Sequence, residues 1–107
     1  MAKQILFLTT EEVQAKHAAD PALFLLDVRT EEEWEMHHIP GATLIPMHTL
    51  LQRLSELDPA RETIVICEHG VRSQNVAAYL AENADFVNIA TMVGGMSVWN
   101  GPKEVGA

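Results

Sequence analysis

The sequence predicts an α/β fold in which helices flank both faces of a mainly parallel central sheet. Short apolar runs alternate along the chain with segments of helical periodicity, as in folds whose parallel strands are joined by helices. Two of these runs, Leu23–Val28 and Thr63–Cys67, are almost continuously apolar. This pattern is typical of strands that are buried on both faces of a parallel sheet.

The first strand and the first helix are expected near the N-terminus. Gln4–Leu8 is predicted to form a short strand. Thr9 and Glu12 have the spacing of a capping box, so a helix is expected to run from there to about His17. The Asp-Pro pair at positions 20–21 predicts a turn before the second strand, Leu23–Val28.

The second helix is expected to begin in the same way as the first. Thr30 and Glu33 form another capping box, and a short helix is predicted through Trp34 and Met36. The stretch HIPGA at positions 38–42 predicts a turn, and a brief strand is expected at Thr43–Ile45.

The second half of the chain is expected to add helices and two further strands. A helix that ends at the Asp-Pro pair 58–59 is predicted by leucines at helical spacing, namely Leu50, Leu51, Leu54 and Leu57. After the strand Thr63–Cys67, a helix is expected from near Ser73. Its inner face is expected to carry Val76, Ala77, Leu80, Ala81 and Ala84. Phe86–Ala90 is predicted to be the last strand, and residues 93–99 a turn into a terminal helix.

Length, composition and charge indicate one globular domain over residues 1–107. A chain of 107 residues can bury roughly two-thirds of its unfolded surface, and 48% of these residues are hydrophobic. The formal net charge is −8, from 15 acidic and seven basic residues. This charge disfavours nucleic acids and anionic membranes as partners, and it means that an anionic substrate needs a locally positive pocket.

The cysteine count and the N-terminal segment favour a cytoplasmic protein. One cysteine cannot form an internal disulfide, which fits a reducing compartment. The apolar run Ile5–Leu8 is too short for the core of a signal peptide or for a membrane span.

Cys67, the single cysteine, is the candidate nucleophile. It ends a predicted strand, as Asp27 does, and sites in parallel sheets form where loops leave the carboxyl ends of strands. Backbone N–H groups of the segment Cys67–Arg72 and the positive end of the next helix would stabilise a thiolate or a persulfide anion. Gly70 would allow a positive φ in this loop, and Ser73 would cap the helix.

Arg72 has two interpretations, and so does the cysteine. The guanidinium could bind an anionic donor through two parallel hydrogen bonds, or it could tie the loop to a carboxylate such as Glu33 or Asp27. Cys67 could also be a small buried hydrophobe at the end of a strand. The glycine, arginine and serine that follow it favour the reactive thiol.

Three segments carry motifs that occur together in one family. They are DVRTEEEWEMHHIPGA at Asp27–Ala42, CEHGVRS at Cys67–Ser73 and GGMSVW at Gly94–Trp99. In the same order they resemble an Asp-x-Arg segment with a His-Ile-Pro-Gly-Ala signature, an active-site loop of Cys-x-x-Gly-x-Arg-Ser form, and a Gly-Gly-x-x-x-Trp ending. The chain thus resembles the rhodanese-like family of single-domain sulfurtransferases from about residue 4 to residue 102.

The resemblance implies a function as well as a fold. It implies a persulfide on Cys67 and transfer of sulfane sulfur from a donor such as thiosulfate to cyanide, a thiol or a protein. The substrate would be bound by the loop residues Glu68, His69, Gly70, Val71 and Arg72. Two positions depart from the family. His37 stands where a glycine is usual, and Glu68 stands where members that use thiosulfate often carry arginine or a neutral residue. A carboxylate there would repel a dianion unless it points outward.

The remaining residues of interest have structural interpretations beside the functional ones. Asp27 and Arg29 are expected to fix neighbouring loops as a charged pair. His69 could donate to an oxyanion or face solvent. His37 and His38 lack the paired spacing of zinc sites, so no metal and no cofactor are expected. An apolar pocket above the sulfur, or simply the core, would be formed by Trp34, Trp99, Met92 and Met96.

Two alternative functions remain open at this point. A phosphatase of the Cdc25-like type shares the fold by resemblance, but its loop has one more residue between cysteine and arginine than the four found here. The wider ring suits a phosphoryl group and the tighter ring suits one sulfur atom. A non-catalytic or sulfur-carrier module that acts on a protein partner is the second alternative.

Overall fold

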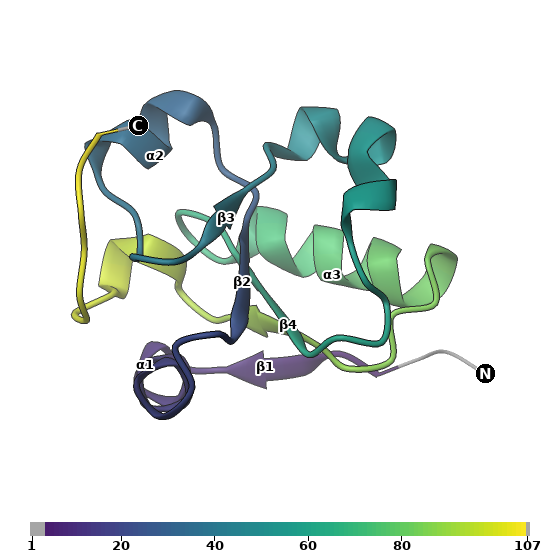
Figure 1. Ribbon diagram of the computed structural model, residues 1–107, viewed down its shortest axis with the longest axis horizontal. Coiled ribbons are helices and arrows are strands. Elements are labelled where there is room, and N and C mark those ends of the chain that lie inside the picture. The colour runs from purple at the N-terminus through teal and green to yellow at the C-terminus, as the bar shows by residue number, and fades with distance from the viewer. Residues whose placement is uncertain (1–3, 107) are drawn as a thin grey trace.

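The computed structural model describes residues 4–106 and contains a five-stranded sheet in which all paired strands are parallel (Figure 1). In chain order the elements are β1 (Leu6–Leu8), α1 (Thr10–Ala19), β2 (Phe24–Asp27), α2 (Glu31–Met36), β3 (Thr43–Leu44), the 3₁₀ helix η1 (Met47–Glu56), β4 (Thr63–Ile66), α3 (Val71–Asn83), β5 (Ile89–Met92) and the 3₁₀ helix η2 (Gly95–Val98). The predicted α/β fold is confirmed.

The strand order β1-β5-β4-β2-β3 places β2 and β4 side by side in the interior of the sheet. From β2 the chain continues through α2 to β3 on one side, and from β4 it continues through α3 to β5 on the other. Open α/β sheets bind their ligands at the carboxyl ends of two adjacent strands whose connections run to opposite sides of the sheet. Asp27 and Ile66 are register partners there, so the segments that follow them start as neighbours.

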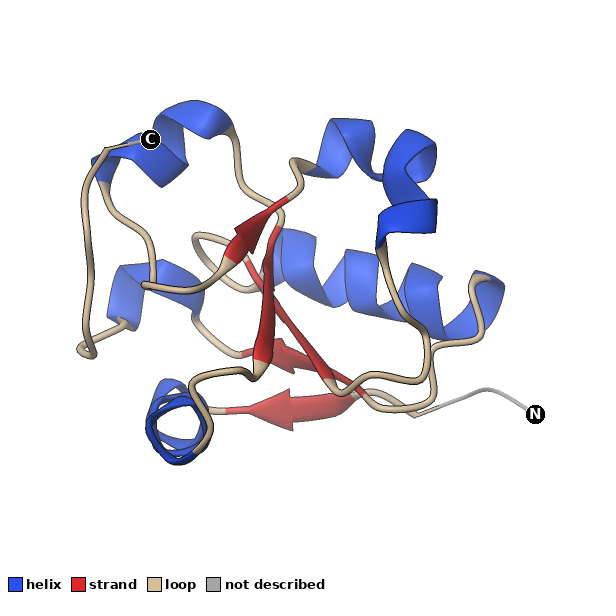
Figure 2. Ribbon diagram, in the orientation of Figure 1, coloured by secondary structure: helices blue, strands red, loops and turns tan. Residues whose placement is uncertain are grey.

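Helices cover both faces of the sheet, as predicted (Figure 2). One core cluster joins the sheet to α3 and η1, and it includes Leu26, Val65, Cys67, Leu80 and Leu50. The other joins the opposite face to α1 and to the η2 segment, and it includes Leu25, Ile64, Ile66, Val13 and Trp99. Successive strand residues alternate between the two clusters because side chains in a strand point to opposite faces.

Both predicted capping boxes are confirmed. Thr9 Oγ1 accepts from the backbone N–H of Glu12 at 3.1 Å, and the Glu12 carboxylate accepts from the Thr9 N–H at 2.8 Å. Thr30 and Glu33 make the same exchange at 3.2 and 3.0 Å. The box therefore fixes the Glu33 carboxylate as well as the start of α2.

The last strand lies further along the chain than predicted. Phe86–Ala90 was expected, but β5 covers Ile89–Met92. Phe86 packs in the core and donates its N–H to the Leu80 carbonyl at the end of α3, so it is not available for the sheet. Thr91, which lies beyond the predicted end at Ala90, belongs to β5, where it is buried and its hydroxyl pairs with that of Ser73.

The helix predicted from Leu50, Leu51, Leu54 and Leu57 and the terminal helix predicted within residues 93–99 are both 3₁₀ helices. Arg53 interrupts η1 with non-helical angles (φ −118°, ψ 16°). Leu50 and Leu57 are buried as expected, but Leu51 is 65% exposed, so it does not belong to the inner face. Within residues 4–106, no helix has the length and apolar character needed to cross a bilayer.

Candidate functional site

Cys67 lies where β4 ends, next to the end of β2. The Val28 N–H donates to the Ile66 carbonyl at 2.9 Å. The backbone segments that follow β2 and β4 therefore begin side by side, directly after the register pair Asp27–Ile66. The segment that follows β2 leads into α2, and the segment that follows β4 leads into α3. Because β2 and β4 are neighbouring parallel strands, α2 lies close to the loop of Cys67 although the two segments are far apart in the sequence.

The sulfur of Cys67 is almost fully buried and has two partners among the described residues. The Gly70 N–H donates to Sγ at 3.0 Å, and the thiol donates to Ser73 Oγ at 3.4 Å. The residue is 1% exposed. The expected ring of several backbone donors is represented within residues 4–106 by the single N–H of Gly70. This donor stands at the N-terminus of α3, whose dipole also favours negative charge at the sulfur.

Gly70 ends the loop in the conformation that the sequence predicts. Its φ is +90°, a region that side chains rarely occupy, and it is the N-cap residue of α3. A Cβ atom here would lie 2.9 Å from the Gly94 nitrogen. The expectation that Ser73 caps the helix is wrong. Ser73 is buried in the first turn, and its hydroxyl lies between the sulfur and Thr91 Oγ1, which is 2.7 Å away.

Arg72 binds Glu33 through two parallel hydrogen bonds. Arg72 Nη1 and Nη2 donate to Glu33 Oε1 and Oε2 at 2.9 and 2.8 Å. The second interpretation of Arg72, a tie to a carboxylate of α2, therefore describes this structure. The hydrogen bonds from Arg72 lower the pKa of Glu33 to about 2, and the carboxylate in turn raises the pKa of Arg72.

Arg29 is fully buried and its guanidinium has four acceptor groups. It donates to both oxygens of Asp27 at 2.9 to 3.1 Å, and to Glu68 Oε1 at 3.1 Å. It also donates to the carbonyls of Glu33 and His37 at 3.3 and 2.7 Å. Burial alone would lower the pKa of Arg29, but the hydrogen bonds and charges of Asp27 and Glu68 raise it. The expectation that Asp27 and Arg29 fix neighbouring loops agrees with these contacts.

Glu68 is turned toward Arg29, and its side chain is 23% exposed. His69 and Val71 are exposed on the loop, Val71 at 66%. The ionic groups around the loop comprise three carboxylates, from Asp27, Glu33 and Glu68, and two guanidinium groups, which leaves a formal net charge of −1. The locally positive pocket that a dianion would need is therefore not formed by these groups.

The turn at Gly94 and Gly95 packs against the loop of Cys67, and the residues that follow it bind the loop through backbone hydrogen bonds. The Met96 N–H donates to the Cys67 carbonyl and the Ser97 N–H to the Glu68 carbonyl, each at 2.9 Å. The sequence predicted a turn at residues 93–99, and the family resemblance included Gly94–Trp99, but neither predicted the contact of this turn with the loop. Two adjacent glycines with φ of +80° and +67° are the local signal that could have indicated a close approach of backbones.

The other residues singled out from the sequence lie elsewhere. Trp99, Met92 and Met96 belong to the core cluster on the face opposite that of Cys67, so they do not wall a pocket above the sulfur. Trp34 stacks on His38 with a centroid distance of 3.7 Å. The ring nitrogens of His38 contact the Trp34 carbonyl and the Glu104 carboxylate.

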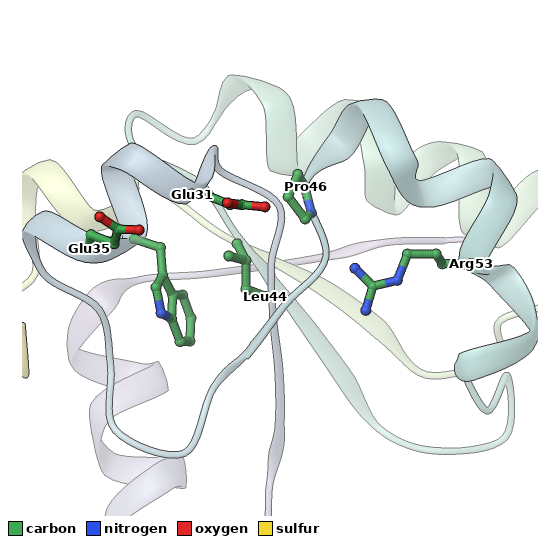
Figure 3. A pocket seen from close by; sticks show the side chains of 6 residues that line it. Glu31, Glu35, Leu44, Pro46 and Arg53 are labelled. Carbon is green, nitrogen blue, oxygen red and sulfur yellow. The ribbon is translucent and has the colours of Figure 1, made fainter. Parts of the chain in front are cut away.

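A pocket of about 290 Å³ lies beside α2, β3 and η1 (Figure 3). It is lined by Glu31, Trp34, Glu35, Leu44, Pro46 and Arg53. None of these residues belongs to the loop 67–72, so this hollow is separate from the site of the thiol.

Comparison with known proteins identifies the family. Residues 9–102 match the model of the rhodanese-like domain. The chain belongs to the rhodanese-like sulfurtransferase family. The match includes the loop of Cys67, the α2 segment with Glu33, and the glycine turn that contacts the loop, so the site described above lies wholly within the rhodanese-like domain.

Relatives and solved structures agree with this assignment. The chain is 36% identical to the putative sulfurtransferase YtwF of Bacillus subtilis over 91% of this chain and 92% of that protein, and 31% identical to the thiosulfate sulfurtransferase GlpE of Pseudomonas syringae over 80% of each. It is also 36% identical to the putative sulfur carrier protein YrkF of Bacillus subtilis, of whose length it spans 55%. A crystal structure of a rhodanese-like domain protein from Staphylococcus aureus superposes with a TM-score of 0.85 at 33% identity, and covers 96% of this chain and 100% of that one.

Proposed function

We propose that this rhodanese-like protein is a sulfurtransferase that carries sulfane sulfur as a persulfide on Cys67. The observation that carries the proposal is the position of the sulfur, with a backbone N–H of Gly70 at 3.0 Å and the N-terminus of α3 directed toward it. Both features favour negative charge on sulfur, and the thiolate is the nucleophilic form of cysteine. A cysteine that only filled the core would need neither.

The first half-reaction loads the sulfur. The Cys67 thiolate attacks the outer sulfur of the donor, the S–S bond of the donor breaks, and its electron pair leaves with the departing group. With thiosulfate the products are a Cys67 persulfide anion and sulfite, so atoms and charge balance. The same N–H that faces the thiolate would stabilise the loaded state, and Arg72, five residues after Cys67, would bind the departing anion if it released Glu33.

The second half-reaction returns the thiolate. A nucleophile such as cyanide or a thiol attacks the outer sulfur, takes it, and leaves Cys67 as it began. A protein can serve as this acceptor, and the name of the relative YrkF, a putative sulfur carrier, supports that version of the proposal. The cycle consumes no oxidant or reductant, and it needs a reduced thiol, which fits a cytoplasmic location.

Intact-protein mass spectrometry tests the proposal. After treatment with a sulfane-sulfur donor and removal of excess reagent, we expect the wild type to gain the mass of one sulfur atom and to lose it when cyanide is added. Cys67→Ser should gain nothing. Loading that survives in Cys67→Ser, or a wild type that no donor loads, would contradict the proposal.

Acceptor kinetics separate an enzyme for small molecules from a sulfur carrier. Discharge of the loaded protein is compared among cyanide, a dithiol and a protein thiol at equal concentration. A carrier should deliver its sulfur fastest to the protein thiol. A phosphatase is disfavoured by the tight loop with four residues between Cys67 and Arg72, and hydrolysis of an aryl phosphate would reverse this view.

A further inference from the structure

Arg72 is the last residue of the reactive segment 67–72, and in this structure its guanidinium is already bound to a carboxylate. Both of its terminal nitrogens donate to Glu33, over 2.9 and 2.8 Å. This is the geometry in which a guanidinium would otherwise bind an oxyanion. An anionic donor that is to use Arg72 must therefore displace a carboxylate that already makes both bonds.

Glu33 cannot move away cheaply, because it is held on its other side by its own helix. Its Oε1 accepts from the Thr30 N–H at 3.0 Å and from the Thr30 hydroxyl at 3.3 Å. Thr30 Oγ1 in return accepts from the Glu33 N–H at 3.2 Å. Releasing Arg72 by rotating Glu33 would break the capping box of α2 as well as the ion pair.

Arg29, the second cation near the loop, is also not available to bind an anionic donor. Arg29 is buried, and Asp27, Glu68 and two backbone carbonyls take up its donors. With Glu33 and Arg72 included, these groups sum to a formal charge of −1. A dianion that approaches the sulfur meets a net negative charge, whereas a donor with one negative charge or none meets a much smaller electrostatic barrier.

We propose that Glu33 is a specificity-determining residue that selects persulfide donors, R–S–SH, over dianionic donors such as thiosulfate. This inference rests on the proposed function of Cys67. The Cys67 thiolate attacks the outer sulfur of R–S–SH, the S–S bond breaks, and R–S⁻ leaves with the electron pair and takes a proton from water. Cys67 then holds the persulfide. The leaving thiolate carries one negative charge, so Arg72 need not release Glu33 to receive a dianion.

The test compares Glu33→Gln with the matched control Glu32→Gln. Glutamine keeps an oxygen for the Thr30 N–H but removes the charge that neutralises Arg72. Glu32 lies in the same helical turn, is exposed and contacts neither arginine, so its variant makes the same change in net charge. Loading rates are measured with three probes, namely thiosulfate, a small alkyl persulfide and a persulfidated protein.

For the wild type we expect a higher kcat/KM with persulfide than with thiosulfate, and the faster of the two persulfides identifies the source of the donor. In Glu33→Gln, the thiosulfate kcat/KM should rise about tenfold through a lower KM, because Arg72 regains its uncompensated charge. The persulfide value should change less than about twofold, as should both values in Glu32→Gln. The ratio of two kcat/KM values does not depend on how much of the enzyme is folded, so a loss of stability does not obscure the result.

An unchanged or lower preference for thiosulfate in Glu33→Gln would overturn the inference. So would an equal change in Glu32→Gln, since that would show a general effect of net charge. These outcomes differ from failure of the proposed function. If no probe adds sulfur to wild-type Cys67, the function itself is wrong. If all probes load it and the ratio does not move, only the role of Glu33 is wrong.

Discussion

Replacing Gly95 with alanine perturbs the contact that holds the reactive loop in place. A Cβ atom at this position would lie 2.4 Å from the Cys67 carbonyl oxygen and 2.5 Å from that of Glu68. Both neighbours are backbone atoms, and both carbonyls accept hydrogen bonds from the residues after Gly95. The methyl group can therefore be accommodated only if the glycine turn and the loop move apart.

Two costs contribute to the expected loss of stability. The φ of Gly95 is +67°, and a residue with a side chain pays roughly 1 to 2 kcal/mol there. Overpacking against atoms that cannot rotate away adds about 1 to 3 kcal/mol. We expect Gly95→Ala to lower the free energy of unfolding by about 2 to 5 kcal/mol, and Tm by roughly 10 to 25 °C for a domain of this size.

Gly106→Ala is the matched control. Gly106 also has a positive φ, of +96°, but a Cβ atom there would have no neighbour within 4 Å. Urea unfolding should therefore show a cost of only about 1 kcal/mol for Gly106→Ala. Sulfur loading on Cys67 should fall in Gly95→Ala even in the fraction that remains folded. Equal destabilisation in the two variants would refute the argument, since it would leave only the backbone conformation and no close packing against the loop.

Three further predictions follow from the ionic and polar contacts. Arg29→Lys should destabilise the protein by about 2 to 4 kcal/mol in urea unfolding, because an ammonium cannot serve four buried acceptor groups at once, and an unchanged midpoint would contradict this. Ser73→Ala should cost about 1 to 2 kcal/mol, because it leaves the buried Thr91 hydroxyl without its partner, and a Thr91→Val background should reduce that cost. Folding lowers the pKa of Glu33 to about 2, so its contribution to stability is complete above its ordinary pKa of about 4.3 and is lost as the pH falls toward 2. Unfolding midpoints measured across this pH range should thus fall more steeply for wild type than for Glu33→Gln, and parallel curves would refute the assignment.

Most of the fold could be predicted because local signals agree with the tertiary structure. Both capping boxes mark real helix starts, and the two nearly continuous apolar runs contain the interior strands β2 and β4, in which seven of eight residues are buried. The misplaced last strand shows the limit of this approach. Thr91 interrupts an apolar pattern but is buried against Ser73, and no local pattern predicts a partner 18 residues away.

The sequence indicated the candidate residues of the site and some, but not all, of their pairings. The loop of Cys67 and the importance of Arg72 followed from residue types and spacing. The pairs Arg72–Glu33 and Arg29–Glu68 each join residues 39 apart, and they arise because β2 and β4 lie side by side while their following loops diverge. Glu33 also has a complete local explanation as a capping residue. The sequence nevertheless offered Glu33, beside Asp27, as a carboxylate to which Arg72 could be tied, but it did not predict the contact of Arg29 with Glu68.

Under the proposed function, we expect different groups to hold the sulfur and to select the donor. The position of the sulfur depends on backbone contacts, since the Cys67 and Glu68 carbonyls bind the glycine turn and Gly70 fits against Gly94. The charge around the loop depends on the carboxylates of Asp27, Glu33 and Glu68 and on the two arginines. Disturbing the first should slow loading by every donor alike, and disturbing the second should change the preference among donors without moving the sulfur. If Gly95→Ala altered the ratio of thiosulfate to persulfide loading as much as Glu33→Gln does, the position of the loop would itself determine selectivity, and Glu33 would have no separate role in it.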